Sequence, residues 1–166
     1  MKKNKAIVIG QSVSKSLSPT IFNYWFSKYK IKGKYEYLEI QKNKLEKKIF
    51  TKLINMKIKG FNVTIPHKES IMPYLDFVDS HSKKIGAVNC VTIKRKKLHG
   101  SNTDWVGYYK TINKITKKQE RVRNQAIVVG YGGASKAIVY ALLKLKYKKI
   151  HIFNRTLNKM KNIKNK

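Results

Sequence analysis

The apolar residues of this chain follow two alternating patterns, short continuous runs and runs spaced three and four residues apart. Residues 6–9 form a continuous run that ends at Gly10, which is typical of a buried strand. After that run, apolar side chains recur at helical spacing as far as Tyr29. We expect Ser18 to cap this helix and Pro19 to lie in its first turn. The same patterns predict strands at 35–39, 60–65, 126–129 and 149–153, helices at 45–54, 69–75, 103–115 and 136–145, and a hairpin of 88–93 with 98–102.

The regular alternation of strands and helices indicates an α/β fold. We predict a three-layer α/β domain with a mostly parallel sheet over residues 5–103. A strand, turn, helix and strand at 126–153 predict the start of a Rossmann-type domain. The basic stretch 117–124 is expected to be a solvated connector, and 158–166 a polar tail.

The chain is strongly basic, with 38 Lys and Arg against 8 Asp and Glu and a net charge of +30. Such a balance is found in proteins that bind nucleic acid or anionic membranes. However, nearly all the basic residues are lysines spread along the chain, whereas proteins that read bases or clamp phosphates use more arginine. We therefore favour a general enrichment in lysine and expect no nucleic-acid partner.

The remaining composition points to an intracellular protein with a packed core. Hydrophobic residues make up 42% of the chain, enough for such a core. The single cysteine, Cys90, excludes an intramolecular disulfide and is expected to be a small buried hydrophobe. The apolar stretch after the basic residues 1–5 is too short for a signal peptide, and no stretch is long enough to span a bilayer. We therefore expect a cytoplasmic location and no membrane partner.

A glycine-rich turn, Gly130-Tyr131-Gly132-Gly133-Ala134-Ser135, connects a predicted strand to a predicted helix. Small residues in such a turn let backbone N–H groups approach a pyrophosphate at the helix N-terminus. The next strand ends in Asn154-Arg155-Thr156 and lacks the carboxylate that is typical of NAD sites. Because an arginine there can pair with a 2′-phosphate, the pattern favours NADP. The alternative is a tight turn without a ligand.

Polar side chains also collect at strand ends and loops in the first hundred residues. They include Ser16, Ser18, Asn62, Thr64, Lys68, Asn89, Asn102 and Asp104. Ligands of α/β proteins bind outside the carboxyl ends of the strands, and these groups suit a small polyhydroxylated carboxylic acid. Lys68 and Asp104 could move a proton during hydride transfer between a ketone and an alcohol. Taken singly, Lys68 is better explained as a surface lysine, Asp104 as a helix cap, and Asn62 and Asn89 as turn formers.

Six segments in their order along the chain resemble the shikimate dehydrogenase family. They are 10–19 with Ser16-Leu17-Ser18-Pro19, Asn62-Val63-Thr64-Ile65-Pro66-His67-Lys68, Gly86-Ala87-Val88-Asn89, Asn102-Thr103-Asp104, the glycine turn, and Asn154-Arg155-Thr156. The resemblance implies reversible reduction of 3-dehydroshikimate to shikimate by NADPH, in aromatic amino-acid biosynthesis.

The resemblance also implies a role for particular residues. Lys68 would be the catalytic acid/base, with Asp104 as its partner. The substrate carboxylate would be held by Ser16 and Ser18. The ring hydroxyls would be bound by Thr64, Asn89 and Asp104. The implied NADP-binding residues are Gly130, Gly132, Gly133, Ala134, Ser135, Asn154, Arg155 and Thr156. No metal ligand is implied.

Two features depart from the family pattern. Tyr131 is bulkier than the small residue expected in the glycine turn, and family members continue further at the C-terminal end. The domains are therefore expected to be a catalytic, shikimate-binding domain at 1–104 and an incomplete NADP-binding domain at 105–166. The alternatives are a truncated remnant that retains at most substrate binding, a relative that acts on quinate, and a basic nucleic-acid-binding module. A homodimer is left open.

Overall fold

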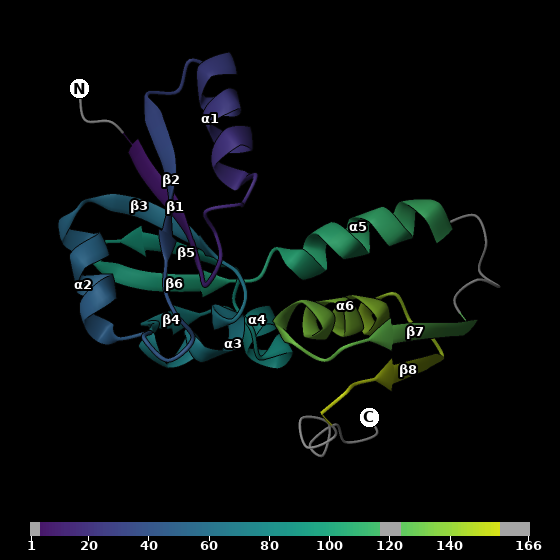
Figure 1. The fold of residues 1–166 in the computed structure, drawn as a ribbon. Helices are drawn as coiled ribbons and strands as arrows, with labels where there is room; N and C mark the ends of the chain where they lie inside the picture. The colour runs from purple at the N-terminus through teal and green to yellow at the C-terminus, as the bar shows by residue number, and fades with distance from the viewer. Residues whose placement is uncertain (1–3, 117–123, 157–166) are drawn as a thin grey trace.

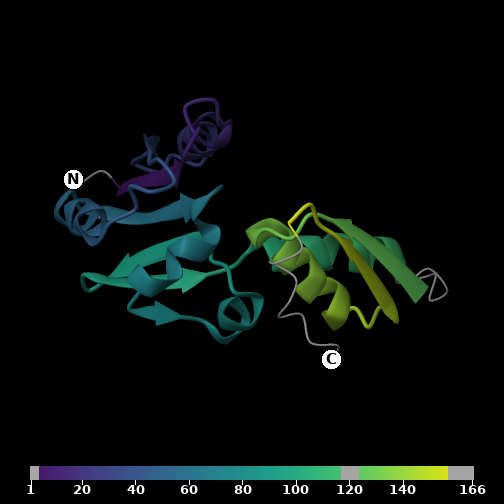
Figure 2. The same cartoon turned by 60° about the horizontal axis from the view of Figure 1, so that its bottom comes forward.

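The computed structural model describes residues 4–116 and 124–156, which form two α/β units joined by the short segment 102–103 (Figures 1 and 2). The elements of the first unit are β1 (Asn4–Gly10), α1 (Ser18–Lys28), β2 (Gly33–Glu39), α2 (Lys47–Asn55), β3 (Ile58–Val63), α3 (His67–Ser70), the 3₁₀ turn η1 (Met72–Tyr74), β4 (Phe77–Val78), α4 (Ser80–Ile85), β5 (Cys90–Lys94) and β6 (Lys97–Ser101). Those of the second unit are α5 (Asp104–Thr116), β7 (Gln125–Val129), α6 (Gly133–Lys144) and β8 (Lys149–Phe153).

The first unit contains a six-stranded sheet in the order β2-β1-β3-β5-β6-β4. Strand β1 runs parallel to both of its neighbours, β5 runs antiparallel to both of its neighbours, and β4 runs parallel to β6. Only β5 therefore runs in the direction opposite to the other strands of this sheet, which confirms the prediction of a mostly parallel sheet. The predicted hairpin consists of β5 and β6. Arg95 and Lys96 form its turn, and both have a positive φ.

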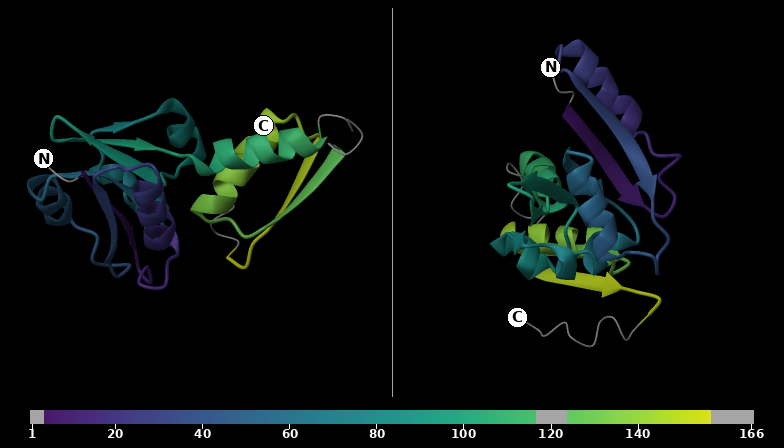
Figure 3. Two further views of the ribbon diagram at one scale, coloured as in Figure 1. Left: turned by 90° about the horizontal axis from the view of Figure 1, so that it is seen from above. Right: turned by 90° about the vertical axis from the view of Figure 1, so that its left-hand side faces the viewer.

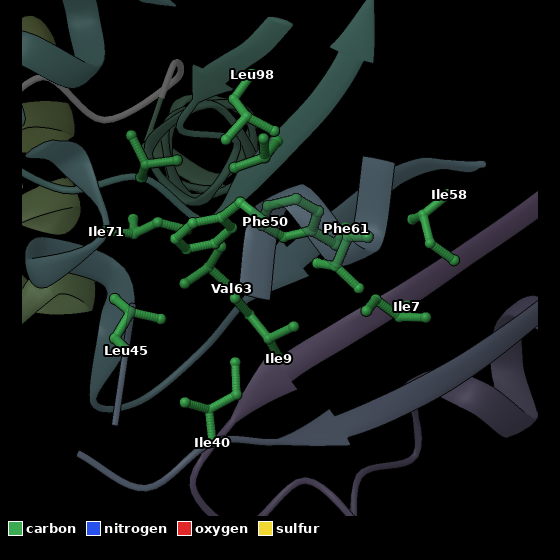
Figure 4. Packing of buried hydrophobic residues seen from close by; sticks show 13 residues of the cluster. Ile7, Ile9, Ile40, Leu45, Phe50, Ile58, Phe61, Val63, Ile71 and Leu98 are labelled. Atoms are coloured by element: carbon green, nitrogen blue, oxygen red, sulfur yellow. The ribbon is translucent and has the colours of Figure 1, made fainter. Parts of the chain in front are cut away.

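Side chains of alternate residues in the strands pack on the two faces of this sheet, as the period of two requires. Ile7 and Ile9 of β1 belong to the larger cluster, which also contains Phe50 and Leu53 of α2 (Figure 4). Val8 between them packs on the opposite face, with residues of α1. Figure 3 shows α1 lying along β1 and β2. The helices on both faces of the sheet give the three predicted layers.

Several predicted boundaries were wrong by a few residues. Ser18 does not cap α1, because Leu17 occupies the N-cap position and Ser18 is already helical, whereas Pro19 does lie in the first turn. Leu45 precedes α2, and β3 runs two residues earlier than expected. The helix predicted at 69–75 is the short α3 followed by the 3₁₀ turn η1.

The sequence patterns missed β4 and α4 because both elements are very short. A local signal for α4 was nevertheless present. The Asp79 carboxylate caps the helix by accepting a 2.6 Å hydrogen bond from the backbone N–H of Ser82. The helix ends at Gly86, whose left-handed φ of 73° is costly for other residues.

The second unit matches the predicted strand, turn, helix and strand. β7 and β8 pair in parallel from Gln125 with Lys149 to Val129 with Phe153, and α5 and α6 lie against one another. The connector predicted at 117–124, apart from residue 124, and the tail predicted at 158–166 lie outside the described residues. In the part of the chain that the structure describes, no helix is both long and apolar enough to cross a bilayer.

Candidate functional site

The centre of the candidate site is an ion pair between two residues from different units. Lys68 Nζ of α3 lies 2.7 Å from Asp104 Oδ2 at the first residue of α5. The two side chains retain 14% and 29% of their exposure, so the pair is shielded but open to a ligand. The N-terminus of α5 favours a negative charge on Asp104. The sequence therefore identified two residues that the fold does bring together.

Asn89 and Asn102 hold Asp104 in place. The Asn89 amide donates a 2.6 Å hydrogen bond to Asp104 Oδ1 and a 3.0 Å bond to Thr103 Oγ1, and its oxygen accepts from the backbone N–H of Thr103 at 2.8 Å. Asn102 Oδ1 accepts from the backbone N–H of Asp104 at 3.0 Å, and its own amide donates to the carbonyl of Ala87. Asn102 thus caps α5, and the carboxylate of Asp104 remains free to pair with the lysine.

Lys68 is positioned mainly by the backbone around it. The N–H of Val88 donates a 2.7 Å hydrogen bond to the carbonyl of Lys68. The ring of His67, which is fully buried, lies with Nε2 2.7 Å from the carbonyl oxygen of Ile40. Because a carbonyl can only accept, His67 carries its proton on Nε2. These contacts fix α3 between the end of β2 and the start of β5.

Three of the predicted substrate-binding residues, Ser16, Ser18 and Thr64, follow the carboxyl ends of β1 and β3 along the chain. Ser16 Oγ accepts a 3.2 Å hydrogen bond from the backbone N–H of Ser18. The N–H of Thr64 donates to the carbonyl of Ile9 at 2.9 Å, which ties the end of β3 to that of β1. A side chain on Gly10 would lie 2.5 Å from the methyl group of Thr64, so this glycine is needed for the two ends to meet.

Glu39 holds the loop that carries the serines. Its carboxylate accepts a 3.0 Å hydrogen bond from the backbone N–H of Ser14, and hydrogen bonding from Ser14 holds the pKa of Glu39 below its ordinary value. Sequence reasoning placed Glu39 in a strand and gave it no role in the site.

The second unit forms a cavity of about 580 Å³ at the predicted glycine turn. Gly130, Gly132, Asn154, Arg155 and Thr156 all line it, together with Tyr131 and the ends of β7 and β8. Gly130 has a φ of +93°, a conformation that favours glycine, and Gly132 precedes the first residue of α6 with open space around it. The predicted turn and the predicted 2′-phosphate clamp therefore face the same cavity.

A second cavity, of about 430 Å³, lies between the two units. It is lined by Lys68 and Glu69 of α3, by residues 132–135 of the glycine turn, and by Lys42, Ile65 and Pro66. Ala134 and Ser135 thus lie on this side of the turn. Lys136 of α6 forms an ion pair with Glu69 across the join. The candidate acid/base therefore lies beside the turn that is predicted to bind the cofactor.

Two further sequence predictions concern Cys90 and metal ligands. Cys90 is a free thiol and is only partly buried, so the prediction of a buried hydrophobe was too strong. Burial nevertheless raises the pKa of the thiol, which favours the unreactive neutral form. Among the described residues, no group of three or more His, Cys, Asp or Glu side chains could hold a metal ion.

Comparison with known proteins gives consistent matches along the chain. Residues 8–91 match the shikimate dehydrogenase substrate binding domain. The shikimate dehydrogenase (NADP(+)) of Clostridium beijerinckii is 43% identical over 151 residues, which are 90% of this chain and 54% of that protein. The chain thus spans about half the length of the curated relatives it matches.

Solved structures give the same result. The crystal structure of shikimate dehydrogenase from Aquifex aeolicus superposes with a TM-score of 0.84 at 38% identity, over 95% of this chain and 58% of that chain. That of Thermus thermophilus, in complex with NADP(H) and shikimate, superposes with a TM-score of 0.79 at 28% identity, over 93% and 57%.

Proposed function

This chain belongs to the shikimate dehydrogenase family, and we propose that it forms the substrate-binding and catalytic part of an NADP-dependent enzyme that interconverts 3-dehydroshikimate and shikimate. The observation that carries the proposal is the Lys68–Asp104 ion pair, which lies beside a glycine turn at the join of the two units. An acid/base next to a dinucleotide-binding turn is the arrangement that reduction of a ketone requires.

The cofactor-binding residues fit NADP. The cavity at the glycine turn has open space at Gly132 and a left-handed Gly130, so backbone N–H groups at the start of α6 can approach a pyrophosphate. Asn154, Arg155 and Thr156 would hold the 2′-phosphate, which the exposed guanidinium of Arg155 can pair with. When bound, the reduced nicotinamide supplies the hydride for the ketone carbon.

Lys68 completes the reduction by donating a proton to the carbonyl oxygen, which becomes the hydroxyl of shikimate. Asp104 holds the ammonium in place through the 2.7 Å ion pair. In the reverse direction Lys68 accepts the hydroxyl proton. A positioned acid/base of this kind contributes roughly 10²–10⁴-fold to the rate.

We further propose that the substrate occupies the space between the strand ends and α5. Ser16 and Ser18 would bind its carboxylate, while Thr64, Asn89 and Asp104 would bind the ring hydroxyls. Asn89 already donates its amide to Asp104 and Thr103, so its contact with substrate would be shared with its positioning of the carboxylate. The domain boundary proposed near residue 104 coincides with the start of α5.

NADPH formation from shikimate and NADP, with NAD in parallel, tests the proposal. The variants are Lys68→Met and Asp104→Asn, and Lys59→Met is the control because Lys59 is exposed and lies at the start of β3, whereas Lys68 follows the end of that strand. We expect turnover with NADP that the first two variants reduce at least about 100-fold and the control leaves unchanged.

Shikimate binding, measured by calorimetry without cofactor, separates binding from catalysis. If the folded chain binds shikimate but shows no turnover, the sequence-based alternative of substrate binding alone replaces the enzymatic proposal. If it neither binds shikimate nor turns it over, the proposed function is wrong.

A further inference from the structure

The cavity of about 580 Å³ at the glycine turn and the cavity of about 430 Å³ between the units share one residue. Gly132 lines both the first cavity, which Arg155 also lines, and the second, which Lys68 also lines. No atom lies within 4 Å of a Cβ atom added at Gly132, so the backbone at this point is open to a ligand. A dinucleotide with its adenosine half in the first cavity would therefore cross the turn at Gly132 and continue into the second.

The second cavity is lined by three charged residues, all from the first unit, and two of them are already paired. They are Lys42, Lys68 and Glu69. Lys68 forms an ion pair with Asp104, and Glu69 forms one with Lys136. Lys42 is exposed, and its ammonium has no ion-pair partner within residues 4–116 and 124–156. This cavity therefore has one ammonium that is available to an anionic ligand.

Lys42 follows β2 in a segment that hydrogen bonds fix to α3. The carbonyl of Ile40 accepts a 2.7 Å hydrogen bond from the ring of His67, the first residue of α3. The backbone N–H of Lys44 donates to the carbonyl of Gln41 at 2.9 Å, which closes a turn around Lys42. The backbone at Lys42 is thus anchored to the helix that carries the candidate acid/base, and only the side chain has to move to reach a ligand.

The chemistry of the glycine turn indicates which group of a dinucleotide would use this ammonium. Residues 130–135 contain no charged side chain, so the turn offers a pyrophosphate only backbone N–H groups and the Ser135 hydroxyl. Each phosphate of the pyrophosphate carries a negative charge, and a lysine ammonium is a compact point charge suited to it. Lys42 lines the second cavity together with residues 132–135 of the turn. Its ammonium can therefore supply the positive charge that the turn lacks.

We propose that Lys42 is a further cofactor-binding residue, which pairs with the pyrophosphate of the dinucleotide from the side of the first unit. This inference rests on the proposed function for the identity of the cofactor. NAD and NADP share the pyrophosphate, so Lys42 acts on both alike, whereas Arg155 distinguishes them by the 2′-phosphate. Of the two cavities, Lys42 lines only the second, and Arg155 lines only the first.

The test compares Lys42→Met with the matched control Lys44→Met. Lys44 is also exposed and lies two residues further along the chain, but it lines a separate cavity of about 510 Å³ that contains no residue of the glycine turn. Both variants remove one positive charge from a chain of net charge +30. The control therefore accounts for the general attraction of this basic protein for anions.

Calorimetry measures the affinities for NADP and for NAD at low and at high salt. At low salt, Lys42→Met should weaken both by the same factor, about three- to tenfold, because one charge-assisted contact is lost. High salt should reduce this factor by screening the pair. Lys42→Arg should retain most of the affinity, since it keeps the charge, and Lys44→Met should bind as the unaltered protein does. Shikimate affinity without cofactor and Tm should not change in Lys42→Met, which separates loss of a cofactor contact from loss of structure.

Each adverse result has a distinct meaning. If Lys42→Met binds both cofactors as tightly as Lys44→Met does, the role of Lys42 is overturned while the proposed function stands. A loss for NADP alone would place Lys42 at the 2′-phosphate and overturn its assignment to the pyrophosphate. A loss of shikimate affinity without any loss for the cofactors would overturn it as well. Absence of NADP and NAD binding by the unaltered protein would instead refute the NADP-dependent function, and the role of Lys42 with it.

Discussion

Replacing Gly133 with alanine should loosen the contact between the glycine turn and the candidate acid/base. A Cβ atom at position 133 would lie 2.8 Å from Cβ of Lys68 and 3.3 Å from Cβ of Ala87. Both neighbouring atoms are attached directly to the backbone, so neither can rotate away. The alanine can be accommodated only if α6 moves away from α3 and from the segment before β5.

The size of the effect follows from two opposing terms. Adding a methyl group to a tightly packed contact costs about 1–3 kcal/mol. Alanine is more favourable than glycine in the middle of a helix by about 0.5–1 kcal/mol, but Gly133 is the first residue of α6, so this gain offsets only a small part of the cost. We therefore expect a net destabilisation of about 1–2 kcal/mol, or a decrease in Tm of roughly 2–8 °C for a chain of this size.

Gly107 of α5 provides a control with the opposite expected sign. It is also in a helix, but nothing lies within 4 Å of an added Cβ atom. Gly107→Ala should therefore stabilise the protein by about 0.5–1 kcal/mol. Thermal unfolding monitored by tryptophan fluorescence compares the two, since Trp105 of α5 lies against His81 of α4 and Tyr140 of α6.

Shikimate affinity without cofactor gives a second measurement. Because α6 contacts Lys68, Gly133→Ala should weaken shikimate binding, while Gly107→Ala should leave it unchanged. If Gly133→Ala were as stable as Gly107→Ala and bound shikimate normally, the inferred packing of the glycine turn on Lys68 would be refuted.

Three other predictions concern the cofactor, the pH dependence and a helix cap. Arg155→Gln should weaken NADP binding at least about tenfold and leave NAD binding nearly unchanged, since only the charge-assisted pair with the 2′-phosphate is lost; equal losses for both cofactors, measured by calorimetry, would contradict this. The folded-state pKa of Glu39 is lowered by its hydrogen bonds with Ser14, so its contribution to stability is present above its ordinary pKa of 4.5 and is lost as the pH falls through the lower folded value. Urea unfolding should therefore show a difference between the unaltered protein and Glu39→Gln at neutral pH that disappears in acid, whereas a constant difference would argue against the hydrogen bond. Asn102→Ala should destabilise the protein by about 1 kcal/mol, because two backbone N–H groups of α5 lose their acceptor; urea unfolding without a change in midpoint would exclude this cap.

The sequence by itself determined the local structure of this protein. The period of two in the strands and the helical spacing predicted most elements, and β8 runs over the residues expected. The glycine turn was predicted after the first strand and Arg155 after the second strand of a strand, helix and strand unit, and both line one cavity. These features could be predicted from the sequence because each depends on residues that are near one another in the chain.

The tertiary structure decided which distant residues meet. Lys68 and Asp104 are 36 positions apart, and their pairing depends on the sheet order that places α3 beside the start of α5. The hydrogen bond from the Tyr35 hydroxyl to the Asn62 side chain spans 27 positions and left no signal in the sequence, because a tyrosine in a buried strand shows only an apolar ring in the hydrophobic pattern. Gly133 was predicted as a phosphate-binding glycine, yet its contact with Lys68 depends on how the two units pack. Periodicity reports which side of an element is buried, and only the complete fold determines what it is buried against.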